Sequence, residues 1–246
     1  MNAKIVRDVL TIAMMKSIPD LKRQPLSLTL FGLISALPLF FMMMLGGQLS
    51  NGLIGAMVAT TGFIGLMAAI QDIAGDRYLK IREIIVAMPV HPISYAMGIA
   101  LAPLIVSSPG LVVFAALAIW LGVLTFSSLL WSIIILILCW ATLSSLGFLI
   151  STYLQGASIY TLNTLSNLLG IALVFLPPVY YPEEMLGSFS WAALLFPTSN
   201  AAGLIRIYAG LLDVDVLMLF ARWSILVTTM IACSIATLVK AKWRES

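Results

Sequence analysis

Long apolar stretches separated by short polar ones dominate the chain. A helix needs about 20 apolar residues to cross the hydrocarbon core of a bilayer, because each residue adds about 1.5 Å to its length. Six stretches reach that length, and they predict spans at Leu28–Gly47, Gly52–Gln71, Met97–Leu121, Ser128–Ile150, Ile159–Pro178 and Val216–Val239. The runs are continuous, whereas the strands of a membrane barrel alternate apolar and polar residues. The pattern therefore predicts an all-α membrane protein with six transmembrane helices.

The segment before the first span has a helical pattern of its own. Polar residues recur every three or four positions from Lys4 onward, and apolar residues fill the opposite side as far as Met15. This arrangement predicts an amphipathic helix on the inner membrane surface, ending near Pro19 because proline interrupts the backbone hydrogen bonds of a helix. A plain tail beside the membrane is the alternative that the pattern leaves open.

The stretch Val179–Asp215, between spans five and six, is too long for a turn and too apolar for a soluble domain. It contains two apolar segments, Met185–Phe196 and Ala201–Leu212, which are too short to cross a bilayer. They predict two re-entrant or interfacial helices whose backbone ends are satisfied by the surrounding protein. Ser199 or Asn200 is expected to cap the second of them.

The composition agrees with a chain whose main solvent is lipid. Hydrophobic residues make up 61% of the 246 residues and charged residues 9%, and the mean hydropathy is +1.09. A soluble domain carries about 25% charged residues, so there is too little polar surface here to cover a water-exposed globule. Disordered, collagen-like and disulfide-stapled proteins are excluded as well. Cys139 and Cys233 lie inside apolar runs and are expected to be small buried residues.

Basic residues lie almost entirely on one side of the predicted topology. Eleven of the 13 fall in the N-terminal segment, between spans two and three, or in the C-terminal tail. Because Lys and Arg favour the cytoplasmic side, both termini are expected in the cytoplasm, with the chain in the inner or plasma membrane of the cell. The bases flank membrane ends and do not form a compact basic domain, so no nucleic-acid partner is expected.

Span five carries a polar stripe in its first half. Asn163, Asn167 and Gly170 share one face of that span, and Thr164 follows the first asparagine. An asparagine facing lipid is costly, so the stripe is expected to point into the bundle, a subunit interface or a solvated path. Hydrogen bonding between helices is the simpler alternative. Small residues four positions apart in span two predict close helix packing there.

The inner connection Asp72–Ala96 is the one inner loop with substantial length and charge. Asp76 and Lys80 stand four residues apart, and the run Tyr78–Met88 contains no glycine or proline before Pro89 stops it. These features predict a short helix with one apolar and one charged face, which could receive force from a soluble partner. A solvated turn that only joins two spans is an equal alternative.

Catalytic chemistry is not visible in the sequence. His91 is the single histidine, no cluster of His, Cys and carboxylates has metal-site spacing, and no lysine follows a glycine as in a phosphate-binding loop. Arg222 is the one charge inside a predicted span, close enough to its start to reach the interface. We therefore expect no enzyme activity, no metal and no bound cofactor on this chain, and a power source on another polypeptide.

The inner connection reads Asp76-Arg77-Tyr78-Leu79-Lys80-Ile81-Arg82-Glu83 and ends at Met88-Pro89. It resembles the cytoplasmic signature of type-2 ATP-binding-cassette (ABC) exporter permeases, in which an acidic residue and arginine precede a Gly-Thr-Leu-Glu run and a hydroxyl residue before proline. The acidic residue, the arginine, the glutamate and the proline match at that spacing. Lys80-Ile81-Arg82 stands in place of Gly-Thr-Leu, and Met88 in place of the hydroxyl residue.

The outer stretch carries a second likeness. Pro182 and Glu184 are followed by Trp191, by Phe196-Pro197-Thr198 and by Arg206. This order resembles the paired re-entrant helices that precede the last span in the same family, where asparagine often stands in place of Phe196. Together with an N-terminal amphipathic helix and six spans, the likeness covers nearly the whole chain.

The resemblance implies one permease domain over residues 1–246, with an amphipathic segment at 1–25, the six-span bundle at 28–239 and a cytoplasmic tail at 240–246. It implies a homodimer, or a heterodimer with a sister permease, that exports its substrate. Two cytoplasmic ABC ATPase subunits would bind ATP and magnesium and drive the membrane unit through a coupling helix at Arg77–Met88.

The resemblance also implies roles for individual residues. The ATPase-coupling residues would be Asp76, Arg77, Lys80, Arg82, Glu83, Met88 and Pro89. The substrate path, between spans two and five at the dimer interface, would contain Asn163, Thr164 and Asn167. The outer gate would contain Pro182, Glu184, Trp191, Pro197 and Arg206.

Two other classes of function stay open at this stage. A channel or an ATP-independent carrier would show flux in vesicles that contain this chain alone. A membrane-embedded enzyme or assembly factor has no catalytic pair in the sequence to support it.

Overall fold

The computed structural model describes residues 3–23, 48–79, 91–154, 156–213 and 215–240, and this part of the chain is all α-helical, with no strand. Its helices are α1 (Ala3–Arg23), α4 (Leu49–Phe63), α5 (Ala69–Tyr78), α7 (Pro92–Trp120), α8 (Phe126–Tyr153), α9 (Ile159–Phe175), α10 (Pro197–Tyr208) and α11 (Val216–Lys240). A π-helical turn, η1 (Ile64–Ala68), joins α4 to α5, and a 3₁₀ segment, η2 (Glu183–Leu195), precedes α10.

Among the described residues, four helices are long and apolar enough to cross a membrane. They are Leu49–Tyr78, which runs through α4, η1 and α5, and then Ile93–Trp120, Phe126–Tyr153 and Val216–Thr237. They confirm four of the six predicted spans. The fifth predicted span, Ile159–Pro178, corresponds to the shorter helix α9, which has 17 residues and ends at Phe175 before the two prolines. The span predicted at Leu28–Gly47 lies outside the described residues.

The long helix through α4, η1 and α5 is the centre of the bundle, since nearly every residue of α4 is buried. Glycines let the neighbouring helices approach closely, because they have no side chain. A Cβ on Gly65 would lie 3.1 Å from the Trp140 carbonyl oxygen of α8, and a Cβ on Gly147 of α8 would lie 2.8 Å from the Leu66 carbonyl oxygen. The π-helical turn therefore lies where the two helices cross.

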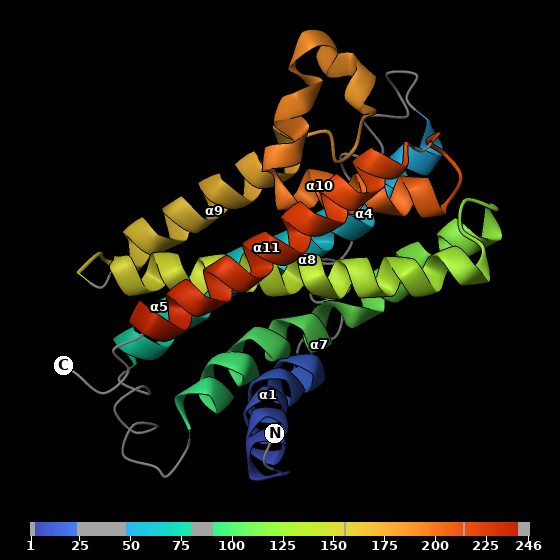
Figure 1. The fold of residues 1–246 in the computed structure, drawn as a ribbon. Helices are drawn as coiled ribbons and strands as arrows, with labels where there is room; N and C mark the ends of the chain where they lie inside the picture. Colours follow the sequence, from blue (N-terminus) through green and yellow to red (C-terminus); the bar gives the residue numbers. More distant parts are fainter. Residues whose placement is uncertain (1–2, 24–47, 80–90, 155, 214, 241–246) are drawn as a thin grey trace.

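The helices alternate in direction along the bundle (Figure 1). The inner end, named from the expected topology, brings together the end of α5, the start of α7, the end of α8 and the start of α9. Arg77 of α5 marks this arrangement, because its Nη2 donates to the Ser151 carbonyl oxygen near the end of α8 at 3.0 Å. At the opposite, outer end, Trp131 of α8 stacks on Tyr208 of α10 with ring centroids 4.9 Å apart.

Helix α1 packs against α7, and it is longer than predicted. It continues through Pro19 to Arg23, so the expected end near Pro19 is wrong. Proline removes one backbone hydrogen bond, but burial of Val9, Ala13 and Ser17 holds the helix in place. A Cβ on Gly98 of α7 would lie 2.7 Å from the Ile12 side chain, which shows how closely the two helices approach.

The inner connection is shorter than predicted. Asp72 and Asp76 lie inside α5 and not in a loop, and α7 already begins at Pro92. The charged end of α5 stays helical because Asp76 and Arg77 form hydrogen bonds with residues of other helices. Residues 80–90, which include most of the predicted coupling helix, lie outside the described part of the chain.

The outer stretch forms two short helical segments, as predicted. The first, η2, stands clear of the long helices at the top of Figure 1 and turns at Gly187, whose φ is +52°. The second, α10, is packed among α4, α8 and α11 and is buried from Thr198 to Arg206. Its cap differs from the expectation, because Phe196 precedes the first turn and Pro197 begins it, which puts Ser199 and Asn200 inside the helix.

Candidate functional site

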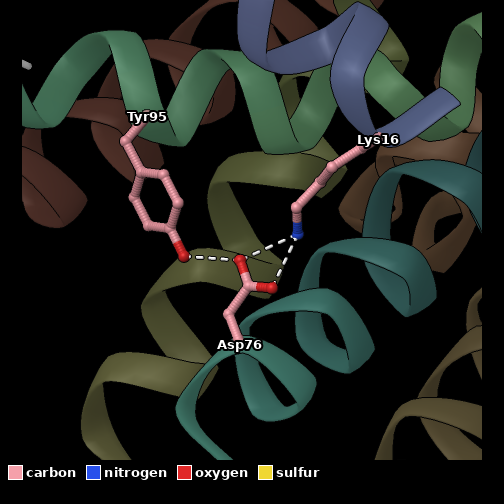
Figure 2. Close-up of polar contacts among 3 residues, drawn as sticks. All are labelled: Lys16, Asp76 and Tyr95. Carbon is pink, nitrogen blue, oxygen red and sulfur yellow. Dashed lines mark hydrogen bonds and ion pairs between the residues drawn. The ribbon is translucent and has the colours of Figure 1, made fainter. Parts of the chain in front are cut away.

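The inner end contains a polar cluster that joins three helices (Figure 2). Lys16 of α1 donates from Nζ to both carboxylate oxygens of Asp76, at 2.9 and 2.8 Å. The Tyr95 hydroxyl of α7 donates to Oδ2 of the same carboxylate at 2.6 Å. Asp76 is 5% exposed, so the predicted coupling residue faces its own bundle. The cluster fixes the end of α5 to both α1 and α7.

Arg77, the next residue of the predicted motif, points to another helix. Its hydrogen bond to the Ser151 carbonyl oxygen is made in the last turn of α8, where carbonyl groups lack partners within the helix. Tyr78 and Leu79 then expose their side chains. The remaining predicted coupling residues, Lys80, Arg82, Glu83, Met88 and Pro89, lie outside the described residues.

The polar stripe of α9 faces the central helix through Gln71 of α5. The Gln71 amide donates to the Ser166 hydroxyl at 3.1 Å and to the Asn167 carbonyl oxygen at 3.3 Å. Gly170 brings the two helices together, because a Cβ there would lie 2.5 Å from the Met67 sulfur. Hydrogen bonding between helices, the simpler of the two interpretations of the stripe, therefore accounts for Asn167.

The other predicted path residues differ in their surroundings. Thr164 is exposed, and its hydroxyl donates to the Tyr160 carbonyl oxygen one turn earlier. Asn163 is half-buried, and its side-chain oxygen has no hydrogen-bond partner among the described residues. This end of α9 thus presents polar groups that its neighbours in the described structure leave partly unused.

The predicted gate residues do not form one cluster. Glu184 and Trp191 are exposed on η2, whereas Pro182 and Pro197 are half-buried at the starts of η2 and α10. Arg206 is 1% exposed, and its two terminal nitrogens donate to the carbonyl oxygens of Pro178 and Val179 at 2.9 and 2.6 Å. Arg206 therefore holds the chain that leaves α9 against α10.

A second buried arginine ties η2 to the last helix. Arg222 of α11 is 3% exposed, and its Nη2 lies 2.5 Å from a carboxylate oxygen of Glu183. The expectation that Arg222 reaches the membrane interface is therefore wrong: the side chain turns inward because a carboxylate partner lies there. Glu183, the neighbour of the predicted gate residue Glu184, was not singled out from the sequence.

Three further residues were also missed from the sequence, namely Lys16, Tyr95 and Gln71. Each lies at the polar edge of an apolar stretch, where topology alone explains a polar side chain. The unusual position of Arg222 within an apolar run was the one signal that could have prompted a search for a buried acidic partner.

The described residues contain no group of three or more His, Cys, Asp or Glu that could hold a metal ion. Cys139 and Cys233 are free thiols. Comparison of the chain with protein-family models, curated proteins and solved structures finds no match. In the described part of the chain, fold and site thus define an all-α bundle with four helices able to cross a membrane and with polar clusters at both ends.

Proposed function

We propose that this chain is the permease subunit of an ABC-2 type exporter, driven by separate cytoplasmic ATPase subunits. The observation that supports this proposal most directly is the position of the inner connection, the segment that resembles the cytoplasmic signature of the family. Asp76 and Arg77 lie in the last turn of α5, and α7 begins at Pro92, so the segment joins the inner ends of two long helices. A partner that pushes this segment acts on both helices at once.

The contacts of the inner end give that push a physical route. Movement at Tyr78 reaches α1 and α7 through Asp76, which binds Lys16 and Tyr95. It reaches α8 through Arg77 and the Ser151 carbonyl oxygen. Because buried, charge-assisted hydrogen bonds resist rearrangement, the four helix ends would move together.

In this proposal two permeases form the membrane unit, and α9 lines the path between them. Asn163 and Thr164 supply polar groups on α9 for an uncharged or amphiphilic substrate. The outer pair η2 and α10 closes the path, with Arg206 and Arg222 holding it to the bundle. ATP and magnesium would bind on the partner ATPases.

The test is purification of the tagged chain from membranes of its native host. A nucleotide-binding subunit should co-purify, and the complex should hydrolyse ATP. Glu83→Arg should lower that ATPase activity about tenfold or more, because the proposal places Glu83 against the partner. Asp213→Arg, an equal charge change in the outer loop before α11, is the matched control and should leave it unchanged. Full activity of Glu83→Arg would contradict the coupling role.

A further inference from the structure

A cavity of about 330 Å³ lies between α1, the central helix and α7 near the inner end. The described residues that line it are Lys16, Ser17, Ala68, Gln71, Asp72, Ala102, Pro103 and Val106. Its volume is at the low end of the range of small-molecule sites, about 300–1,000 Å³. The cavity is therefore large enough for a polar head group and too small for a whole lipid.

The Ser17 hydroxyl, on a residue that lines this cavity, lacks a partner among the described residues. Ser17 is 1% exposed, and its Oγ has no hydrogen-bond partner in the described structure. Nearly all buried polar groups in proteins have a partner, either protein, water or ligand. The Ser17 hydroxyl is therefore a group that a ligand of this cavity could satisfy.

The other polar groups offer both donors and acceptors. Lys16 uses two hydrogens of its ammonium group on Asp76, so a third remains for the cavity. Gln71 uses its NH₂ group on α9, and its side-chain oxygen remains an acceptor. The Asp72 carboxylate of α5 also lines the cavity. Positive and negative groups around one cavity match a ligand that itself carries both charges.

The remaining lining is apolar. It consists of Ala102, Pro103 and Val106 of α7 and Ala68 of η1. A cavity lined by both dipolar and apolar side chains, in a helix bundle able to span a membrane, suits an amphiphile better than a free ion.

We propose that this cavity binds the head group of a phospholipid with a primary amine, as in phosphatidylethanolamine. The lipid phosphate would accept from Lys16 and Ser17, and the ammonium would donate to Asp72 and the Gln71 side-chain oxygen. The acyl chains would leave along α7 past Val106. The proposal needs only that the chain lies in a membrane, so it stands or falls separately from the ATPase-driven export function.

Native mass spectrometry of the purified chain in nanodiscs tests it. The discs would contain equal amounts of phosphatidylethanolamine, phosphatidylcholine and phosphatidylglycerol. Phosphatidylethanolamine should be retained about tenfold more than the other two, because a methylated ammonium cannot donate hydrogen bonds and a glycerol head group has no cation. Equal retention of the three lipids, or preference for phosphatidylglycerol, would overturn the proposal. So would equally tight binding of soluble glycerophosphoethanolamine, since the proposed ligand is a membrane lipid.

Two variants connect the retained lipid to this cavity. Ser17→Ala removes a hydroxyl that has no hydrogen-bond partner among the described residues, so the fold should be preserved, and it should weaken retention about threefold or more. Ala102→Leu fills the cavity and should abolish the preference. Ala116→Leu adds the same side chain to an exposed, apolar groove on α7 and should retain the wild-type preference. Unchanged lipid selectivity in both cavity variants would show that the lipid binds elsewhere.

Discussion

The guanidinium group of Arg222 in α11 occupies the space that Gly203 in α10 leaves free. A Cβ on Gly203 would lie 2.2 Å from the Arg222 Nη1, far inside van der Waals contact. This close approach lets the arginine reach Glu183 at the start of η2, 2.5 Å away. One glycine thus permits the buried ion pair that joins the outer segment to the last helix.

Gly203→Ala should therefore displace Arg222 and break its ion pair. We expect a loss of about 1–3 kcal/mol in the free energy of unfolding, the usual cost of adding volume to a packed site. Gly75→Ala is the matched control, since nothing lies within 4 Å of its added methyl group. The control should be neutral or stabilising by up to about 1 kcal/mol, because alanine favours helix. Thermal unfolding in detergent measures both, and equal stability of the two variants would contradict the packing argument.

Arg206→Lys should destabilise the outer end although it keeps the charge. Arg206 donates to two successive carbonyl oxygens with two nitrogens of one planar group, and a lysine ammonium cannot reproduce that fork. The expected cost is about 1–3 kcal/mol, the penalty for leaving buried carbonyl groups unpaired. Arg7→Lys, at an exposed position of α1, controls for the substitution itself. A stability as high as that of the control would mean that the two hydrogen bonds contribute nothing.

Lys16→Met should leave the Asp76 carboxylate with Tyr95 as its donor in the inner cluster. Because Asp76 is buried and keeps only part of its hydrogen bonding, we expect a loss of about 1–3 kcal/mol in unfolding free energy, the usual cost of removing a partner from a buried polar group. The double variant Lys16→Met/Asp76→Asn removes the unpaired charge and should recover most of that loss. Lys22→Met, an exposed position on the same helix, should change little. A double variant no more stable than the single one would argue against a buried ion pair.

How far the sequence predicts this protein depends on the range of the interactions. Continuous apolar runs were enough to place α4, α7, α8 and α11, because crossing a bilayer is a requirement on length and polarity alone. The predicted end of α1 was wrong because Pro19 is a local signal for a helix end, whereas the packing of α1 on α7 is a tertiary interaction that overrides it.

The polar clusters could not be predicted in the same way. Asp76 has partners 60 residues earlier and 19 residues later, and Glu183 pairs with a residue 39 positions on. Such separations have no period that a sequence pattern can reveal. The stripe of Asn163 and Asn167 was visible, but its partner Gln71 became evident only when the fold placed α5 beside α9.

The central claim is that a cytoplasmic ATPase contacts the segment between α5 and α7. A photoreactive amino acid at Ile84 tests this most directly, in membranes of the native host, with the same probe at exposed Leu195 on η2 as the control. We predict that the probe at Ile84 cross-links to a nucleotide-binding protein, with a yield that changes when vanadate traps ADP in the ATPase after hydrolysis, and that the probe at Leu195 does not. Cross-linking of the nucleotide-binding protein from neither position, or labelling of position 84 from outside the cell, would contradict the account.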